Sequence, residues 1–348
     1  MFFLIFEKHV KTWIQMRNDK MEINITENTS ISSSILIFYS SLNNKMVVVQ
    51  GLIGVLLCVN SLMIFTFIRQ EAFRTDTRYI LFAQMLFLDS TLMVMTDLAV
   101  VGAYFQYAFA SILCVILCVF MDGFTYGTPL TLVVMCLERY VAICLPLRHA
   151  DISNPKTRLI GLLLVWLFSF VPSLTELFAL LSEAPFRFWY SSVVCNFDVM
   201  NVSSWHTLLR TGISQLYFLV LSAITTFTYI KIVVAARLAS ADSKKSASKC
   251  LRTVILHAFQ LVLCFIQFWC PFIESAVMNI DITLFVNVRY SNFVLFLILP
   301  RCLSSLIYGL RDKKFFLALK YNFFFGMNKN IYPVLDEGTS KSNANTCT

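Results

Sequence analysis

Charged residues are scarce in this chain: they make up 14% of its 348 residues, whereas a typical globular protein has about 25%. Glycine is also scarce, with 10 residues, while 58% of the residues are hydrophobic and 33 are phenylalanine. So little charge cannot cover the surface of an ordinary soluble domain, and so little glycine favours long helices over strands. The composition therefore indicates a helical membrane protein.

Histidine is rarer still, with four residues, and no cysteine–histidine spacing resembles a zinc site. Most of the 11 cysteines lie inside apolar runs, where they pack as small hydrophobes and not as a disulfide scaffold. The net charge of +8 comes from basic residues clustered in short segments between apolar runs, as orientation signals are. We therefore expect no enzyme activity, no cofactor and no nucleic-acid partner.

Seven long apolar segments dominate the sequence. Each is long enough to cross the hydrocarbon as a helix, which takes about 20 residues. The runs are continuous and do not show the alternation of apolar and polar residues that is typical of a β-barrel strand. We therefore predict an all-α membrane protein with a seven-transmembrane helix bundle. The expected spans are residues 46–68, 79–102, 112–138, 158–181, 207–235, 253–279 and 284–308.

Lysine and arginine counts predict the orientation of this bundle. They concentrate in the loops after the first, third and fifth spans and after the seventh, so these segments are expected in the cytoplasm. The loops of the other side carry Arg187, Arg210 and Arg289, and we interpret these as charges of the outer loops. Residues 1–45 then form an extracellular segment, 46–310 the transmembrane domain and 311–348 a cytoplasmic part, which begins with a short amphipathic eighth helix on the lipid surface. Met21 is an alternative start to Met1. The expected glycosylation sites on the outer side are Asn24, Asn28 and Asn201.

Two cysteines are expected at the outer, oxidising side. Cys114 begins the third span and Cys195 lies in the long loop after the fourth. A disulfide between them would tie the loop to the helix; the alternative is two unrelated thiols. Cys114 and Arg139 are 139 − 114 = 25 residues apart, which is ~37 Å of helix and enough for one span to join both membrane faces.

Several polar residues lie inside the predicted spans, where they are costly and usually functional. Asn60, Asp89 and Ser304 are expected to form a polar core that faces the bundle interior. For Asp89 we expect a sodium or proton site. The alternative for all three is simple hydrogen bonding between helices.

A switch is predicted at the cytoplasmic end. Glu138 and Arg139 can pair in a resting state and separate when helices shift, so that Arg139 contacts a partner protein. Pro271 would form a hinge in the sixth span below Trp269. The alternatives are an ordinary interfacial arginine and a proline without function. The tyrosines assigned to the same switch are Tyr140, Tyr229 and Tyr308.

The outer halves of the third, fifth, sixth and seventh spans carry polar residues among apolar neighbours, the usual lining of a small-molecule pocket. An acid inside a bundle needs a cationic partner or a raised pKa, so the two acids are the sharper candidates. Any of these residues could instead face another helix. The candidate ligand-binding residues are Asp122, Tyr126, Gln215, Tyr217, Glu274 and Asn292.

Five motifs resemble those of the odorant receptors, a branch of the rhodopsin-like G-protein-coupled receptor family, and of the teleost type in particular. They lie within residues 46–320, which the resemblance covers, and they are Leu137–His149, Leu251–Gln260, Trp269–Glu274, Pro300–Cys302 and Leu306–Asp312. The family's Asn/Asp-Pro-x-x-Tyr motif is replaced here by Ser304 to Tyr308, without the proline that would kink the helix.

This resemblance implies a plasma-membrane receptor in olfactory cilia. It would bind a small odorant and activate a stimulatory olfactory heterotrimeric G protein that raises cyclic AMP. The alternatives are a rhodopsin-like receptor for a peptide or an amine and, from the charges inside the spans, a small transporter or channel.

Overall fold

The computed structural model describes residues 25–145, 154–195, 197–200, 204–238, 241–278, 280–311 and 313–323. Within them, seven helices are long and apolar enough to cross a membrane. The predicted all-α bundle is therefore confirmed. The spanning segments are Asn43–Arg69, Thr77–Tyr104, Ser111–Cys144, Pro155–Glu183, Leu208–Ala235, Ala258–Met278 and Thr283–Ile307.

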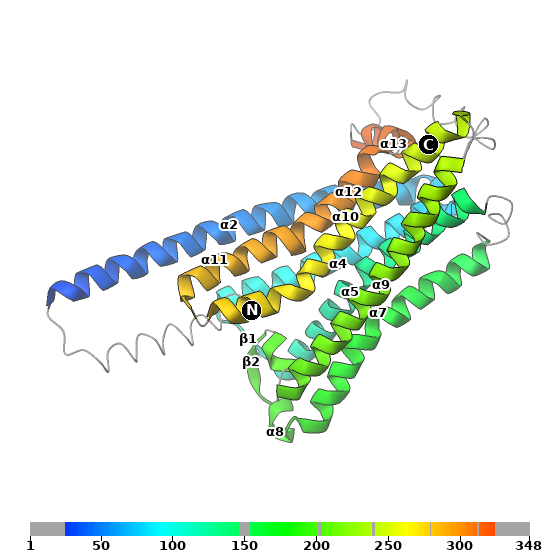
Figure 1. The fold of residues 1–348 in the computed structure, drawn as a ribbon. Coiled ribbons are helices and arrows are strands. Elements are labelled where there is room, and N and C mark those ends of the chain that lie inside the picture. The colour runs from blue at the N-terminus through cyan, green and yellow to red at the C-terminus, as the bar shows by residue number, and fades with distance from the viewer. Residues whose placement is uncertain are drawn as a thin grey trace.

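The spans lie in long helices (Figure 1), three of which coincide with the spanning segments, whereas the others extend beyond them. The first six are carried by α2 (Ile25–Arg69), α4 (Thr77–Tyr104), α5 (Ser111–Cys144), α7 (Pro155–Glu183), α9 (Ser204–Leu238) and α10 (Ala241–Met278). The seventh is built from α11 (Ile282–Asn292), η2 (Phe293–Ile298) and α12 (Leu299–Arg311). The short elements are α3 (Glu71–Thr75), β1 (Ala108–Ala110), α8 (Phe186–Trp189), β2 (Ser192–Val194), η1 (Phe197–Met200) and α13 (Lys313–Phe323).

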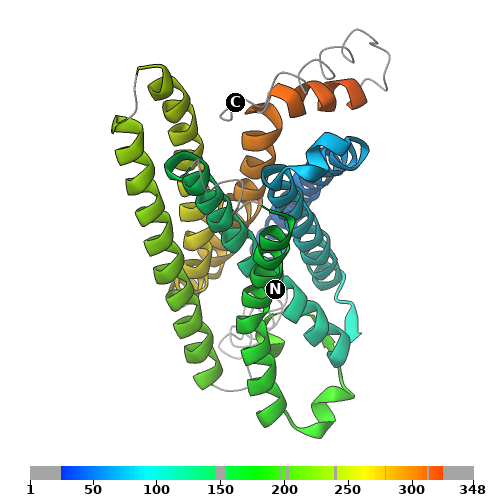
Figure 2. The same cartoon turned by 90° about the vertical axis from the view of Figure 1, so that its right-hand side faces the viewer.

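The bundle has two distinct ends, which Figures 1 and 2 show from two sides. At one end the antiparallel strand pair β1–β2 and a disulfide cover the helices, and we call it the disulfide end. The other end carries Arg139 and α13, and we call it the Arg139 end. Of the seven spans, the one in α5 is the most buried, so α5 is the central helix of the bundle.

Close packing between α5 and α7 depends on two glycines one turn apart. A Cβ atom built on Gly123 would lie 2.6 Å from the ring of Phe170, and one on Gly127 would lie 3.2 Å from Oγ of Ser169. Small residues at this spacing let two membrane helices approach closely, which substitutes for the hydrophobic effect that lipid does not provide. The α5–α7 interface is therefore set by the absence of these side chains.

Gly123→Ala is expected to lower the free energy of unfolding by about 1–3 kcal/mol, because the new methyl group must displace the Phe170 ring in a filled interface. Thermal unfolding of the purified protein in lipid nanodiscs measures the change. The matched control is Gly161→Ala on α7, where no atom lies within 4 Å of the added Cβ. Equal melting temperatures for the two variants would contradict the close-packed interface.

The seventh span leaves the α-helical pattern in its middle. Residues Phe293–Ile298 form a π-helical segment, and the amide of Leu299 donates to the carbonyl of Val294, five residues earlier. Pro300 follows immediately and has no amide hydrogen to donate. The seventh span thus carries a π turn and a proline, both common causes of a helix kink, although it lacks the proline expected at Ser305.

The predicted eighth helix is present as α13, which ends at Phe323. Its Phe315 is fully buried and packs on Phe73 of α3 and on Tyr79 and Phe82 of α4. Farther along, the Asn322 side chain donates to Oγ1 of Thr66 at 3.2 Å. These contacts fix α13 across the Arg139 end of α2 and α4.

Candidate functional site

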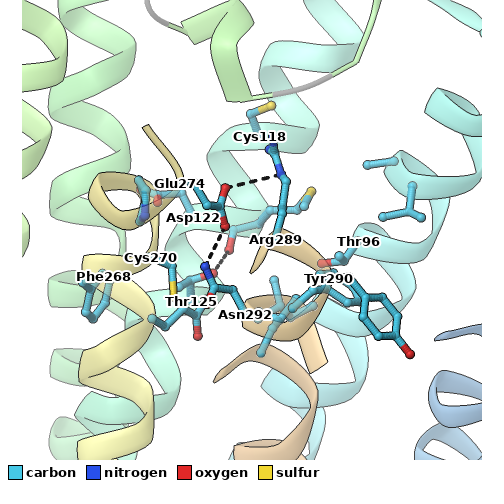
Figure 3. Close-up of a pocket in the computed structure, with 18 of the residues that line it drawn as sticks. Thr96, Cys118, Asp122, Thr125, Phe268, Cys270, Glu274, Arg289, Tyr290 and Asn292 are labelled. Atoms are coloured by element: carbon cyan, nitrogen blue, oxygen red, sulfur yellow. Dashed lines mark hydrogen bonds and ion pairs between the residues drawn. The ribbon is translucent and has the colours of Figure 1, made fainter. Parts of the chain in front are cut away.

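A cavity of about 550 Å³ opens inside the disulfide end of the bundle (Figure 3). Residues of α2, α4, α5, α9, α10 and the seventh span line it, and Cys195 of the connecting loop lies over it. Its size falls in the range of small-molecule sites, and its lining is mainly apolar with a few charged and hydroxyl groups. The cavity is thus the candidate site for a small ligand.

One wall of the cavity holds a buried charge cluster. Asp122 of α5 lies 3.4 Å from the guanidinium of Arg210 on α9, and Glu176 of α7 lies 3.4 Å from the same guanidinium. Ser173 of α7 also donates to Asp122 at 3.0 Å. Arg210 therefore joins three helices, and it provides the cation that a buried acid at Asp122 requires.

A second ion pair lies where α10 meets the seventh span. Glu274 of α10 lies 3.4 Å from Nε of Arg289, and the amide group of Asn292 donates to the same carboxylate at 3.1 Å, as Figure 3 shows. Close by, Lys45 of α2 lies 5.6 Å from the ring centroid of Tyr290 and donates to the Asn287 side chain. Charged groups therefore surround an otherwise apolar space.

Four of the six predicted pocket residues line this cavity: Asp122, Tyr126, Glu274 and Asn292. The other two, Gln215 and Tyr217, are not among its lining residues. Instead, the Tyr217 hydroxyl donates to the carbonyl of Phe168 at 2.7 Å, and its ring packs on that of Tyr126. From α9 it is Ser214, one position before Gln215, that faces the cavity and hydrogen-bonds the Tyr126 hydroxyl.

Sequence reasoning missed three lining cations. Arg210 and Arg289 had been interpreted as charges of the outer loops, and Lys45 as part of the polar N-terminal segment. All three line the cavity. The signal that could have found them is the pair of acids at Asp122 and Glu274, because a carboxylate inside a bundle needs a cation on a neighbouring helix.

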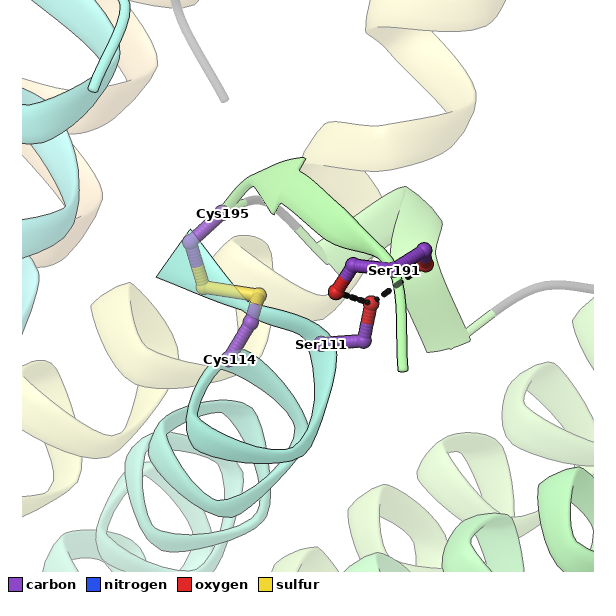
Figure 4. The surroundings of a disulfide bond; sticks show 4 residues. All are labelled: Ser111, Cys114, Ser191 and Cys195. Carbon is purple, nitrogen blue, oxygen red and sulfur yellow. Dashed lines mark hydrogen bonds between the residues drawn. A yellow bond between two sulfur atoms is a disulfide. The ribbon is translucent and has the colours of Figure 1, made fainter. Parts of the chain in front are cut away.

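The predicted disulfide joins Cys114 at the start of α5 to Cys195 after β2 (Figure 4). Beside it, Ser111 donates through its hydroxyl to the carbonyl of Ser191 at 2.9 Å, and its backbone amide donates to the same carbonyl at 3.0 Å. In the antiparallel pair of β1 and β2, Phe109 lies opposite Val193. Covalent and hydrogen bonds together hold this loop over the cavity.

Replacing both cysteines, Cys114→Ser with Cys195→Ser, is expected to lower the free energy of unfolding by about 2–4 kcal/mol, because the unfolded chain regains the freedom of the closed loop. Thermal unfolding of the purified protein in lipid nanodiscs reports the loss. Cys58→Ser removes an exposed free cysteine and serves as the control. A double variant as stable as this control would contradict a stabilising role for the bridge.

The predicted hinge region of α10 turns a different aromatic residue toward the cavity. Phe268 and Pro271 line it, and the Phe268 ring stacks on Tyr126 with centroids 5.0 Å apart. Trp269 is about half exposed on the outside of the bundle, at 49%, and is not a lining residue. The structure therefore brings Phe268, and not Trp269, to the place where a ligand would contact α10.

A buried polar core lies below the cavity. The guanidinium of Arg301 on α12 lies 3.8 Å from Asp89 of α4, and both side chains are essentially inaccessible to solvent. Thr128 of α5 donates to Asp89 at 2.8 Å, while Arg301 donates to the Gln267 side chain at 3.2 Å and to the Leu297 carbonyl at 2.6 Å. This ion pair connects α4, α5, α10 and the seventh span.

The expected sodium site at Asp89 does not fit these contacts. The guanidinium of Arg301 already supplies the positive charge beside the carboxylate, and a second cation there would meet like-charge repulsion at low dielectric. The structure therefore replaces the predicted ion site with an ion pair inside the chain.

The remaining polar-core residues form short hydrogen-bonded links between helices. Asn60 of α2 donates to Ser90 of α4 at 3.1 Å and accepts a hydrogen bond from the Ser305 hydroxyl. The Ser304 hydroxyl lies against the side-chain amide of Gln260, which donates to it. Asn60 and Ser304 thus both join α12 to neighbouring spans.

At the Arg139 end, Glu138 and Arg139 form an ion pair of 3.4 Å with both side chains mostly buried. The Tyr140 ring lies 6.3 Å from that of Phe227 on α9, and Tyr229 is half-buried on the same helix. The side chain of Tyr308, the sequon residues Asn24 and Asn201, and the side chain of Asn28 lie outside the described part of the chain.

Comparison with known proteins agrees with this architecture. The model of the 7 transmembrane receptor (rhodopsin family) matches residues 59–308. Odorant receptor 131-2 of Danio rerio is 50% identical over 305 residues, which cover 88% of this chain and 93% of the relative. Somatostatin receptor type 5 of Rattus norvegicus is 29% identical over 272 residues, 74% of this chain and 71% of the relative. The chain therefore belongs to the rhodopsin family of seven-transmembrane receptors, which are not enzymes.

Proposed function

We propose that this protein is an odorant receptor: a small odorant binds in the cavity at the disulfide end, and the Arg139 end then activates a stimulatory heterotrimeric G protein that raises cyclic AMP. The observation that carries the proposal is the 50% identity to a zebrafish odorant receptor along 88% of the chain. An internal cavity of about 550 Å³ with a mainly apolar lining supports a small organic ligand.

The orientation follows from the same proposal. The disulfide end faces the outside, because a disulfide persists in an oxidising compartment. The Arg139 end faces the cytoplasm, as the excess of lysine and arginine in its loops favours. The receptor then lies in the plasma membrane of olfactory cilia with an extracellular N-terminus.

Contacts below the cavity suggest how a ligand shifts the receptor toward its active state. Phe268 and Gln267 are neighbours on α10 and both line the cavity, and Gln267 also accepts a hydrogen bond from Arg301. A ligand that moves α10 therefore alters the contacts of Arg301, which pairs with Asp89 in the core. The ligand shifts the equilibrium only as far as it binds the two arrangements differently.

The G protein would meet the surface that this shift opens. In the described structure Arg139 is held by Glu138 beside it. Displacement of the part of α10 at the Arg139 end would release Arg139 toward the cytoplasmic partner. The Glu138–Arg139 pair is thus the resting lock of the proposed switch.

Cells that express the receptor with a cyclic AMP reporter test the proposal against a panel of amino acids, bile acids, steroids and amines. A concentration-dependent rise with at least one class of compound is the expected result. Flat responses despite verified surface expression would contradict the odorant function. A ligand-gated current or solute flux without cyclic AMP would favour the channel or transporter alternative.

A further inference from the structure

A buried cluster of two carboxylates and one guanidinium adjoins the cavity; Asp122 and Arg210 line the cavity, whereas Glu176 is not among its lining residues. Asp122 and Glu176 both form ion pairs with Arg210, and Arg210 is the one cation that acts on either carboxylate among the described residues. Two carboxylates therefore share a single guanidinium. An ammonium group of a ligand placed beside Asp122 would neutralise the second carboxylate in a site where unpaired charge is costly.

The lining contributed by α2 and the seventh span carries an excess of positive charge. Glu274 and Arg289 pair with each other, but Lys45 forms no ion pair with a carboxylate of the described residues; it contacts the Asn287 side chain and the Tyr290 ring. Lys45 comes from α2 and lies against α11, whereas the Asp122 cluster joins α5, α7 and α9. The two excess charges thus have opposite sign and come from different helices.

The rest of the cavity lining is mainly apolar. It includes Met121, Leu92 and Phe293, and about 550 Å³ is far more than an ammonium and a carboxylate alone would occupy. The occupant that complements the whole surface has an apolar body with one charged group for each of the two excess charges.

We propose that the cavity selects zwitterionic amphiphiles, with an ammonium group against Asp122, an acidic group against Lys45 and an apolar body between these two groups. This ligand class rests on the proposed receptor function and makes it more specific. An amine alone would leave Lys45 without a counter-ion, and an acid alone would leave the Asp122–Glu176 pair with its excess charge.

A matched series of linear compounds tests the proposal: ω-amino carboxylic acids of increasing chain length, with the alkylamine, the alkanoic acid and the alcohol of each length. Two readouts are needed, cyclic AMP in cells and the ligand-induced rise in melting temperature of the full-length receptor in nanodiscs. We expect one chain length of the zwitterion to act at concentrations at least about tenfold lower than either singly charged analogue, because it forms both charge contacts.

Two charge-removing variants assign the ends of the ligand. Lys45→Gln is expected to abolish the advantage of the zwitterion over the alkylamine, whereas Lys45→Arg should keep it. Asp122→Asn is expected to abolish the advantage of the zwitterion over the alkanoic acid. Arg187→Gln, which removes an exposed cation of α8 that does not line the cavity, is the matched control and should leave the ranking of compounds unchanged.

The outcomes separate this ligand class from the receptor proposal. Cyclic AMP responses in which the amine, acid or alcohol acts as well as every zwitterion would overturn the ligand class and leave the receptor function standing. Thermal stabilisation by the zwitterion without cyclic AMP would do the reverse. A folded receptor that no zwitterion of any length stabilises or activates would also overturn the ligand class.

Discussion

Arg301→Met is expected to lower the free energy of unfolding of this receptor by about 3–5 kcal/mol, because it leaves the carboxylate of Asp89 buried without its cation. Methionine has a similar length and an apolar end, so the loss reports the charge and not a cavity. The substitution also removes the hydrogen bonds to Gln267 and to the Leu297 carbonyl. Thermal unfolding in nanodiscs gives the change directly.

A second substitution at Asp89 distinguishes lost pairing from general damage. The double variant Asp89→Asn with Arg301→Gln has no buried charge and should recover most of the lost stability, since neutral replacement of a buried ion pair is often tolerated. Arg187→Met, at an exposed arginine, is the control and should be nearly silent. A single Arg301→Met variant as stable as the parent would show that the two residues are not an ion pair.

Arg139→Ala is expected to weaken the ligand-dependent cyclic AMP response by at least about 30-fold with normal surface expression. Truncating one partner of a buried, hydrogen-bonded charge pair at an interface costs about 2–5 kcal/mol. This estimate assumes the proposed contact between Arg139 and the G protein. Lys156→Ala removes an exposed cation at the same end of the bundle and is the control.

Glu138→Gln should act in the opposite direction from Arg139→Ala. It removes the 3.4 Å ion pair that holds Arg139 in the resting structure. Both side chains are mostly buried but still reach water, and we take the contribution of the pair as up to about 1 kcal/mol, so basal cyclic AMP should rise about two- to fivefold. Unchanged basal signalling together with a normal response from Arg139→Ala would contradict the switch.

The seven spans could be predicted from the sequence because each is a continuous apolar run of sufficient length. Inside the hydrocarbon, such a run has little alternative to forming a helix. The pairing of Cys114 with Cys195 could be predicted as well, since both were placed at the same oxidising end. These features depend on composition and topology, which a single sequence records well.

The side-chain arrangement of the cavity was harder to predict because it depends on helix rotation. Gln215 was chosen as a pocket residue, but the helix turns Ser214 toward the cavity, and a step of one residue corresponds to about 100° of rotation. Trp269 and Phe268 differ in the same way. The periodicity of apolar residues in the sequence could not resolve such steps, because these helices carry apolar residues on every face.

The partners of buried charges could not be predicted for a related reason. Asp89 was recognisable as costly inside a span, but nothing along the chain connects it to Arg301, which lies more than 200 residues later. Arg210 and Arg289 were assigned to loops because they lie near the ends of apolar runs, although they line the cavity. Long-range pairing of charges becomes visible only when the helices are placed beside one another.

The π-helical segment Phe293–Ile298 has a consequence for how the last part of the chain is counted. A π turn behaves as one residue inserted into an α-helix, so every later side chain is rotated by about 100° from where an uninterrupted helix would place it. Deleting one residue there would turn Arg301 away from Asp89 and Ser305 away from Asn60, without changing the identity of any of the four. The six residues of this segment thus determine how the side chains at the end of the seventh span are rotated about the helix axis.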